Sequence, residues 1–184
     1  YLLIAVILGV GLLGYEKKDD IKTAIAKVDG SWTRFDDLFK TYGQNWGVDW
    51  QWLKAIALNE SSLGEAKTVK RGLDVPTDIE GSKSYDGLSW GLMQVTLKTA
   101  QWLDSSATEV KLNDPSYSIN LAARYLAYLS RQFSGTASSN LEWIIKSYNQ
   151  GPGNSQKERA GTIAGYAGEY WARFQRNLTR VKEG

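Results

Sequence analysis

Apolar residues recur three and four positions apart along most of the chain, and this spacing constrains the fold more than any other feature of the sequence. That period places apolar side chains on one face of an α-helix, whereas a half-buried β-strand alternates at every second residue. Beyond Asp20, almost the whole chain follows the helical period. Because no internal repeat or second domain is apparent, we predict a mainly α fold built as a single domain.

Helix-capping residues mark where several of these helices are expected to begin. An aspartate before a proline is a strong start signal, since proline at the first turn loses no hydrogen bond there. The expected helices begin at Ser31, near Asp49, near Thr96, at Asp114-Pro115 (running through Phe133) and at Asn140. A last helix is expected to carry Ile163, Tyr166, Tyr170, Phe174 and Leu178 on one side.

Residues 64–87 have no helical period and are rich in Gly, Asp and Lys, so we predict a long loop there. The loop is interpreted as a solvated charged segment; the alternative is a lid or the source of a functional carboxylate. Its acidic residues are Glu65, Asp74, Asp78, Glu80 and Asp86.

The N-terminal segment is uncharged over residues 1–14, and the charged run 16–20 follows at once. Fifteen helical residues span roughly 22 Å, somewhat less than the ~30 Å hydrocarbon core of a bilayer. We predict a transmembrane anchor over residues 1–15, a juxtamembrane linker over 16–30 and a globular domain over 31–184. A signal-peptide core is the main alternative for the apolar segment.

The composition excludes several classes of chemistry, because the chain has no His and no Cys. Without them there is no Ser-His-Asp triad, no thiol nucleophile, no disulfide and no zinc site of the usual kind. We predict neither a metal nor a cofactor. The net charge of +2 is too small to indicate a nucleic-acid partner.

Glu60 continues the apolar stripe of the second helix, which runs through Leu53, Ile56 and Ala57. A carboxyl group on the buried face of a helix end tends to keep its proton, because burial disfavours the charged form. Such a group suits a general acid for glycosidic bond cleavage. The alternative is a glutamate at a frayed helix end, turned toward water.

Three short blocks of sequence stand out: residues 57–64 (Ala-Leu-Asn-Glu-Ser-Ser-Leu-Gly), 91–95 (Gly-Leu-Met-Gln-Val) and 148–154 (Tyr-Asn-Gln-Gly-Pro-Gly-Asn). In their sequence and order, these blocks resemble the soluble lytic transglycosylase and goose-type lysozyme group. The resemblance covers roughly residues 31–178. It implies a lysozyme-like catalytic domain.

The resemblance also implies roles for the matching residues. Glu60 would be the catalytic acid and base, and Ser61 and Ser62 would orient it or contact an N-acetyl group. Gln94 would offer its amide to a sugar. Tyr148 and Asn149, at a helix end beside a glycine-rich turn, would hold the substrate or the glutamate.

One further tyrosine role has two candidates four residues apart. The goose-type pattern favours Tyr166, whereas the transglycosylase pattern Tyr-Val-x-Arg favours Tyr170 with Arg173. We prefer Tyr166 slightly and keep both as candidate substrate-binding residues.

The function implied is that of a peptidoglycan lytic transglycosylase, which cleaves the β-1,4 bond between N-acetylmuramic acid and N-acetylglucosamine and forms 1,6-anhydromuramic acid. The leading alternative is a muramidase of the goose-lysozyme type that hydrolyses the same bond, with Asp86 as the second carboxylate that such a hydrolase needs. A glycan-binding protein without catalytic activity is the third.

The expected partners are peptidoglycan strands and, through the N-terminal helix, a membrane. The domain would then face the periplasm and cell wall, from an inner membrane or from a phage virion membrane. This arrangement would suit a larger envelope-spanning or virion assembly.

Overall fold

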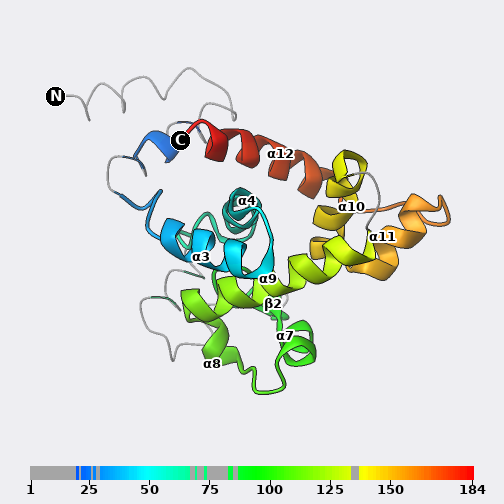
Figure 1. Cartoon of the computed structure of the whole chain (residues 1–184), viewed down its shortest axis with the longest axis horizontal. Coiled ribbons are helices and arrows are strands. Elements are labelled where there is room, and N and C mark those ends of the chain that lie inside the picture. The colour runs from blue at the N-terminus through cyan, green and yellow to red at the C-terminus, as the bar shows by residue number, and fades with distance from the viewer. Residues whose placement is uncertain are drawn as a thin grey trace. The chain divides into compact units, whose positions relative to one another are not determined.

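A computed structural model describes residues 20, 22–25, 27, 30–66, 69, 73, 83–84, 87–133 and 137–184. The described part is mainly helical, as predicted, with one short pair of strands (Figure 1). The elements are α3 (Asp36–Trp46), α4 (Trp50–Ser61), β1 (Ser89–Trp90), β2 (Val95–Thr96), α7 (Leu97–Leu103), α8 (Glu109–Leu112), α9 (Pro115–Gln132), α10 (Ala137–Gln150), α11 (Pro152–Arg159) and α12 (Gly168–Lys182).

Contacts divide the chain into two compact units, residues 1–36 and 37–184. The predicted membrane anchor over residues 1–15 lies outside the described residues, and so do residues 16–19 of the predicted linker. Within the described ranges, no helix is both long and apolar enough to cross a membrane. The anchor, the linker and the start of the globular domain at residue 31 therefore stay predictions.

The helix expected to begin at Ser31 begins instead at Asp36. Residues 31–35 form turns, in which the Thr33 amide donates to the Gly30 carbonyl (3.3 Å) and the Asp36 amide donates to the Thr33 carbonyl (3.0 Å). Gly30 has a φ of 79°, which directs the chain into these turns. The apolar residues within positions 31–35 therefore lie in turns and not in a helix.

Helix α4 begins where the sequence predicted, because the Asp49 side chain accepts a hydrogen bond from the Gln51 amide and caps the helix. Its central residues are buried, including Leu53, Ile56 and Ala57. In Figure 1, α4 is seen end-on, and it packs against both α12 and α9. The helix that carries Glu60 is therefore enclosed by the core along most of its length.

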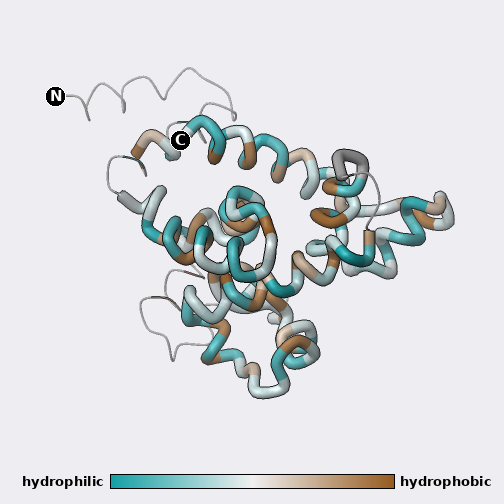
Figure 2. Tube along the Cα trace, viewed as in Figure 1, coloured by the Kyte–Doolittle hydropathy of each residue, from teal (hydrophilic) through white to brown (hydrophobic). Residues whose placement is uncertain are grey.

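Helix α9 also has its predicted limits, with Asp114 as the N-cap, Pro115 in the first turn and Phe133 as the C-cap. Hydrophobic and hydrophilic segments alternate along α9 and α12, as expected for helices with one face in the core (Figure 2). Thr96 caps α7, again as predicted.

The Gly-Leu-Met-Gln block forms the turn of a two-stranded hairpin, which the helical reading of the sequence missed. Strands β1 and β2 are antiparallel, with Ser89 opposite Thr96 and Trp90 opposite Val95. Gly91 has a φ of 74°, and a Cβ atom there would lie 1.8 Å from the Leu112 carbonyl oxygen. Only glycine allows this close backbone approach.

Two other helix boundaries differ from the predictions. Helix α10 begins at Ala137, so Asn140 is a buried residue inside the helix and not its cap. Helix α12 begins at Gly168, so Ile163 and Tyr166 precede it and are exposed. The cause is a turn after α11, where Gly161 has a φ of 69° and interrupts the apolar period.

Candidate active site

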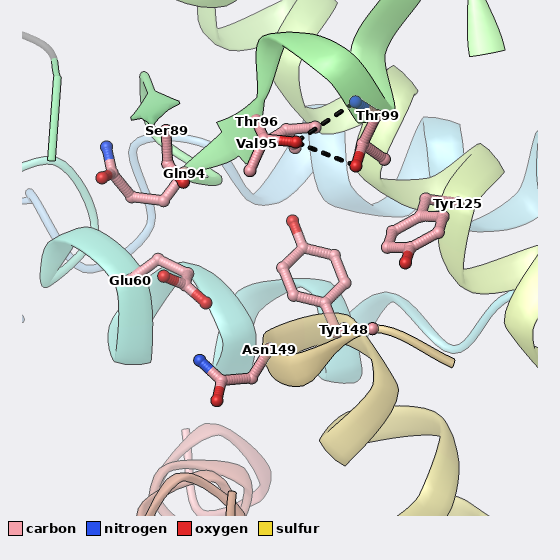
Figure 3. A pocket seen from close by; sticks show the side chains of 10 residues that line it. Glu60, Ser89, Gln94, Val95, Thr96, Thr99, Tyr125, Tyr148 and Asn149 are labelled. Carbon is pink, nitrogen blue, oxygen red and sulfur yellow. Dashed lines mark hydrogen bonds between the residues drawn. The ribbon is translucent and has the colours of Figure 1, made fainter. Parts of the chain in front are cut away.

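A pocket opens between the end of α4, the β1–β2 hairpin, α7, α9 and the end of α10 (Figure 3). It brings together four of the predicted site residues, although they come from three distant parts of the sequence. Its lining residues are Glu60, Ser89, Gln94, Val95, Thr96, Thr99, Tyr125, Tyr148, Asn149 and Gly151.

Glu60 lies in the last turn of α4, and its Oε1 accepts a 2.6 Å hydrogen bond from the Tyr170 hydroxyl. Burial raises the pKa of this carboxyl from 4.5 to about 7, because the charged form loses its hydration. The hydrogen bond from Tyr170 and the charge of Arg173 act in the opposite direction and lower the pKa. The carboxyl can therefore exchange a proton near neutral pH.

A pair of asparagines fixes α12 against α4 and so brings Tyr170 to Glu60. The Asn59 side chain donates to the Tyr170 carbonyl oxygen (3.1 Å), and the Asn177 amide donates to Asn59 Oδ1 (2.6 Å). Asn177 is itself buried. Sequence reasoning missed both residues, because neither stands out until the two helices are known to pack together.

Tyr170, and not Tyr166, contacts Glu60, whereas the choice of the substrate-binding tyrosine stays a prediction. Tyr166 is 66% exposed and lies before α12, where its hydroxyl donates to the Gln150 carbonyl oxygen at 3.4 Å. The Tyr170 hydroxyl is enclosed, and its pKa is raised well above 10 by burial and by the charge of Glu60. It therefore stays protonated and remains a hydrogen-bond donor to Glu60.

The two serines after Glu60 have different surroundings. Ser61 is 1% exposed, and its hydroxyl donates to the Leu92 carbonyl oxygen (2.7 Å) and accepts from the Gly64 amide (3.0 Å). It thus connects the end of α4 to the hairpin turn. Ser62 is exposed and caps α4 in the left-handed conformation, with a φ of 54°. Neither residue lines the pocket.

Gln94 reaches the pocket from the last position of the hairpin turn. It also has a left-handed backbone, with a φ of 47°, and its side-chain amide donates to the Gly91 carbonyl oxygen (2.8 Å). Left-handed backbone is uncommon for residues other than glycine and concentrates at functional sites. Here it turns the Gln94 side chain into the pocket opposite α4 (Figure 3).

Tyr148 joins the end of α10 to the hairpin, because its hydroxyl donates to the Met93 carbonyl oxygen (2.8 Å). Burial and the nearby charge of Glu60 raise its pKa well above 10, so it too stays protonated. Asn149 follows it, is exposed and lines the pocket. Met93 is fully buried and does not line the pocket.

Three hydroxyl residues and one aromatic residue line the pocket without having been predicted: Ser89, Thr96, Thr99 and Tyr125. Thr96 was recognised only as the start of a helix, and the other three were not singled out. Ser89 and Thr96 lie in the hairpin strands, and Thr99 and Tyr125 lie in α7 and α9. None of the four belongs to the three blocks that indicated a site, so the sequence contained no separate signal for them.

The acidic residues of the 64–87 segment do not supply a described second carboxylate. Glu65 is exposed, and Asp74, Asp78, Glu80 and Asp86 lie outside the described residues. Among the described residues that line the pocket, Glu60 is the only carboxylate. The same ranges contain no group of three acidic side chains placed to hold a metal ion.

Comparisons with known proteins identify the family to which the chain belongs. The family described as "Transglycosylase SLT domain" matches residues 37–166. The chain is 28% identical over 153 residues to membrane-bound lytic murein transglycosylase F of Pseudomonas fluorescens, a match that covers 82% of this chain and 27% of that protein. The chain thus spans about a quarter of the length of this curated relative.

A solved structure shares the fold. It is an inactive mutant of the lytic transglycosylase Slt from Pseudomonas aeruginosa, with a TM-score of 0.53 and 21% identity. The match covers 81% of this chain and 22% of that one. At this level of identity the likeness extends to the fold alone.

Proposed function

The chain belongs to the transglycosylase SLT domain family, and from this premise we propose that it cleaves the β-1,4 bond between N-acetylmuramic acid and N-acetylglucosamine in murein. We propose that the product is 1,6-anhydromuramic acid and that Glu60 acts first as the acid and then as the base. The name of the relative from Pseudomonas fluorescens supports murein as the substrate.

The observation that carries the proposal is the setting of Glu60. A single carboxyl lines the described pocket, its pKa is raised to about 7, and a tyrosine hydroxyl holds one of its oxygens. Hydrolysis by the usual glycosidase mechanisms uses a second carboxylate, as a base for water or as a nucleophile. A lytic transglycosylase needs only one, so the presence of one carboxylate among the described lining residues favours this reaction.

In the first step, protonated Glu60 gives its proton to the glycosidic oxygen, and the bond from that oxygen to C1 of the muramic residue breaks. The N-acetyl oxygen of the substrate shields the positive charge that develops at C1. Tyr170 and Arg173 then stabilise the Glu60 carboxylate, through a hydrogen bond and through charge.

In the second step, the Glu60 carboxylate takes the proton of the muramic C6 hydroxyl, and that oxygen bonds to C1. The anhydro ring closes, Glu60 is protonated again, and no water is consumed. One group serves as acid and then as base most efficiently when its pKa lies near the working pH. We propose that Gln94, Tyr148 and Asn149 hold the sugars during both steps.

Product analysis tests the proposal. Isolated murein is digested with the protein, and the soluble fragments are analysed by mass spectrometry. We expect anhydromuramic ends from the native protein and no soluble fragments from Glu60→Gln. The matched control is Glu169→Gln, because Glu169 is an exposed carboxylate at the start of α12. Reducing muramic ends would identify a hydrolase instead, and normal cleavage by Glu60→Gln would refute the assignment of this residue.

We propose further that the domain acts at a membrane surface facing the cell wall. The uncharged run over residues 1–14 and the membrane-bound relative both support this location. Fractionation of cells or virions that contain the full-length protein would test it.

A further inference from the structure

Three aromatic side chains from α7 and α9 form a cluster beside the pocket: Trp102, Tyr125 and Tyr128, here called the aromatic cluster. The two tyrosine rings are stacked, with centroids 6.4 Å apart and planes 10° apart. The Trp102 ring stands nearly perpendicular to both, at 4.7 Å from Tyr128 and 6.5 Å from Tyr125. Edge-to-face contacts of this kind are favourable and fix the orientation of the rings.

The aromatic cluster is continuous with the pocket. Tyr125 belongs to both, and its ring centroid is 5.7 Å from that of Tyr148. Thr99 lines the pocket and lies three residues before Trp102 in α7, on the same face of that helix. In Figure 3, Thr99 and Tyr125 lie on the opposite side of Tyr148 from Glu60. The cluster therefore extends the pocket at the end away from Glu60.

Trp102 contributes little to the core, because 57% of it is exposed. By contrast, Trp32 and Trp90 are buried. A large aromatic side chain that is both exposed and held in a fixed orientation is typical of a binding surface. Its ring face is apolar and uncharged, which suits the C–H face of a pyranose ring, while the nearby Thr96 and Thr99 hydroxyls suit the hydroxyl groups of sugars.

We propose that Trp102 is the platform of an outer subsite, which binds a sugar ring of the same glycan strand beyond the rings held around Glu60. The inference rests on the proposed function, because the glycan is the ligand that would reach from the pocket to the cluster. The outer subsite would give long strands an affinity that short fragments lack, without taking part in bond cleavage.

Binding to oligomers of N-acetylglucosamine tests this inference separately from catalysis. Isothermal titration calorimetry is performed on Glu60→Gln protein with a hexasaccharide and with a disaccharide, which is expected to occupy the pocket and leave the cluster free. Adding Trp102→Ala should weaken hexasaccharide binding about three- to tenfold, the range expected for one aromatic contact, and should change disaccharide binding much less.

Two matched variants serve as controls. Trp102→Phe keeps a ring and should keep most of the hexasaccharide affinity, and Val110→Ala removes another exposed apolar side chain and should change neither affinity. Unchanged hexasaccharide affinity in Trp102→Ala would overturn the inference. An equal loss of affinity for the hexasaccharide and the disaccharide would overturn it as well, because the indole would then support the fold and not bind the far end of a long ligand.

The proposed function can fail independently of this subsite. Native protein that binds the hexasaccharide through Trp102 but releases no fragments from murein would refute the catalytic proposal and leave the subsite intact. Native protein that cleaves murein while Trp102→Ala binds normally would refute only the subsite.

Discussion

Replacing Glu60 with glutamine should stabilise the folded protein in alkaline solution and leave its stability almost unchanged in acid. The side chain of glutamine resembles a protonated glutamate, and it can still accept the hydrogen bond that the Tyr170 hydroxyl gives to Oε1. The two proteins therefore differ mainly where Glu60 is ionised. In the folded chain, ionisation takes place in a desolvated pocket and is unfavourable.

The sign and size of the effect follow from the pKa of Glu60 in the two states. The pKa is 4.5 in the unfolded chain and about 7 in the folded one, so between these values the folded state binds more protons and its stability falls as pH rises. The difference is 2.5 pKa units (7 minus 4.5). At 1.36 kcal/mol per unit, Glu60→Gln should gain about 3 kcal/mol of unfolding free energy above pH 7 and almost none below pH 4.5.

Urea denaturation of both proteins at a series of pH values from 4 to 9 measures this difference, because the other ionisable groups are common to both. The exposed Glu169→Gln variant is the control and should show no comparable rise. A difference between native protein and Glu60→Gln that stays flat across the series would refute the reasoning. So would a native protein that is the more stable of the two at pH 8.

Two further outcomes follow from individual hydrogen bonds. Tyr170→Phe removes the 2.6 Å hydrogen bond that lowers the pKa of Glu60, so this pKa should rise. In a pH–rate profile of murein cleavage, the alkaline fall in rate should therefore move up by about one pH unit. A shift of this fall to lower pH would contradict the reasoning. Ser61→Ala removes the hydrogen bond to the Leu92 carbonyl oxygen and should lower the unfolding free energy, measured by urea denaturation, by about 1–3 kcal/mol. The control Ser62→Ala changes an exposed residue and should alter the unfolding free energy by less than about 0.5 kcal/mol. Equal effects of the two substitutions would show that the hydrogen bond to Leu92 is unimportant.

Local signals predicted those parts of the fold that depend on neighbouring residues. Asp49, Thr96 and Asp114 each cap the helix that the sequence assigned to them, because a cap acts within one turn of its own residue. The same reasoning failed at Ser31 and Asn140, where a residue that can cap a helix lies in a turn or inside a helix. Capping chemistry permits a helix start there, but packing decides whether it is used.

The sequence predicted those residues of the candidate site that belong to a motif, but not the contacts that arise from helix packing. The blocks around Glu60, Gln94 and Tyr148 were visible in the sequence and meet in the described pocket. The choice between Tyr166 and Tyr170 was not visible, because both lie on one face of the helix that the sequence suggested. It depends on where α12 begins and on the asparagine pair between α4 and α12, which are properties of the assembled helices.

That helix pairing also explains how one carboxyl can have a pKa suited to both of its proposed steps. Burial at the end of α4 alone would raise the pKa of Glu60 further, so that the carboxyl would give up its proton less readily. The Tyr170 hydroxyl and the Arg173 charge, both supplied by α12, favour the carboxylate and bring the pKa back to about 7. Helix α4 therefore provides the acid Glu60, and α12 provides the groups that stabilise its ionised form. A variant that loosens the α4–α12 contact should for this reason impair the reaction even with Glu60 intact.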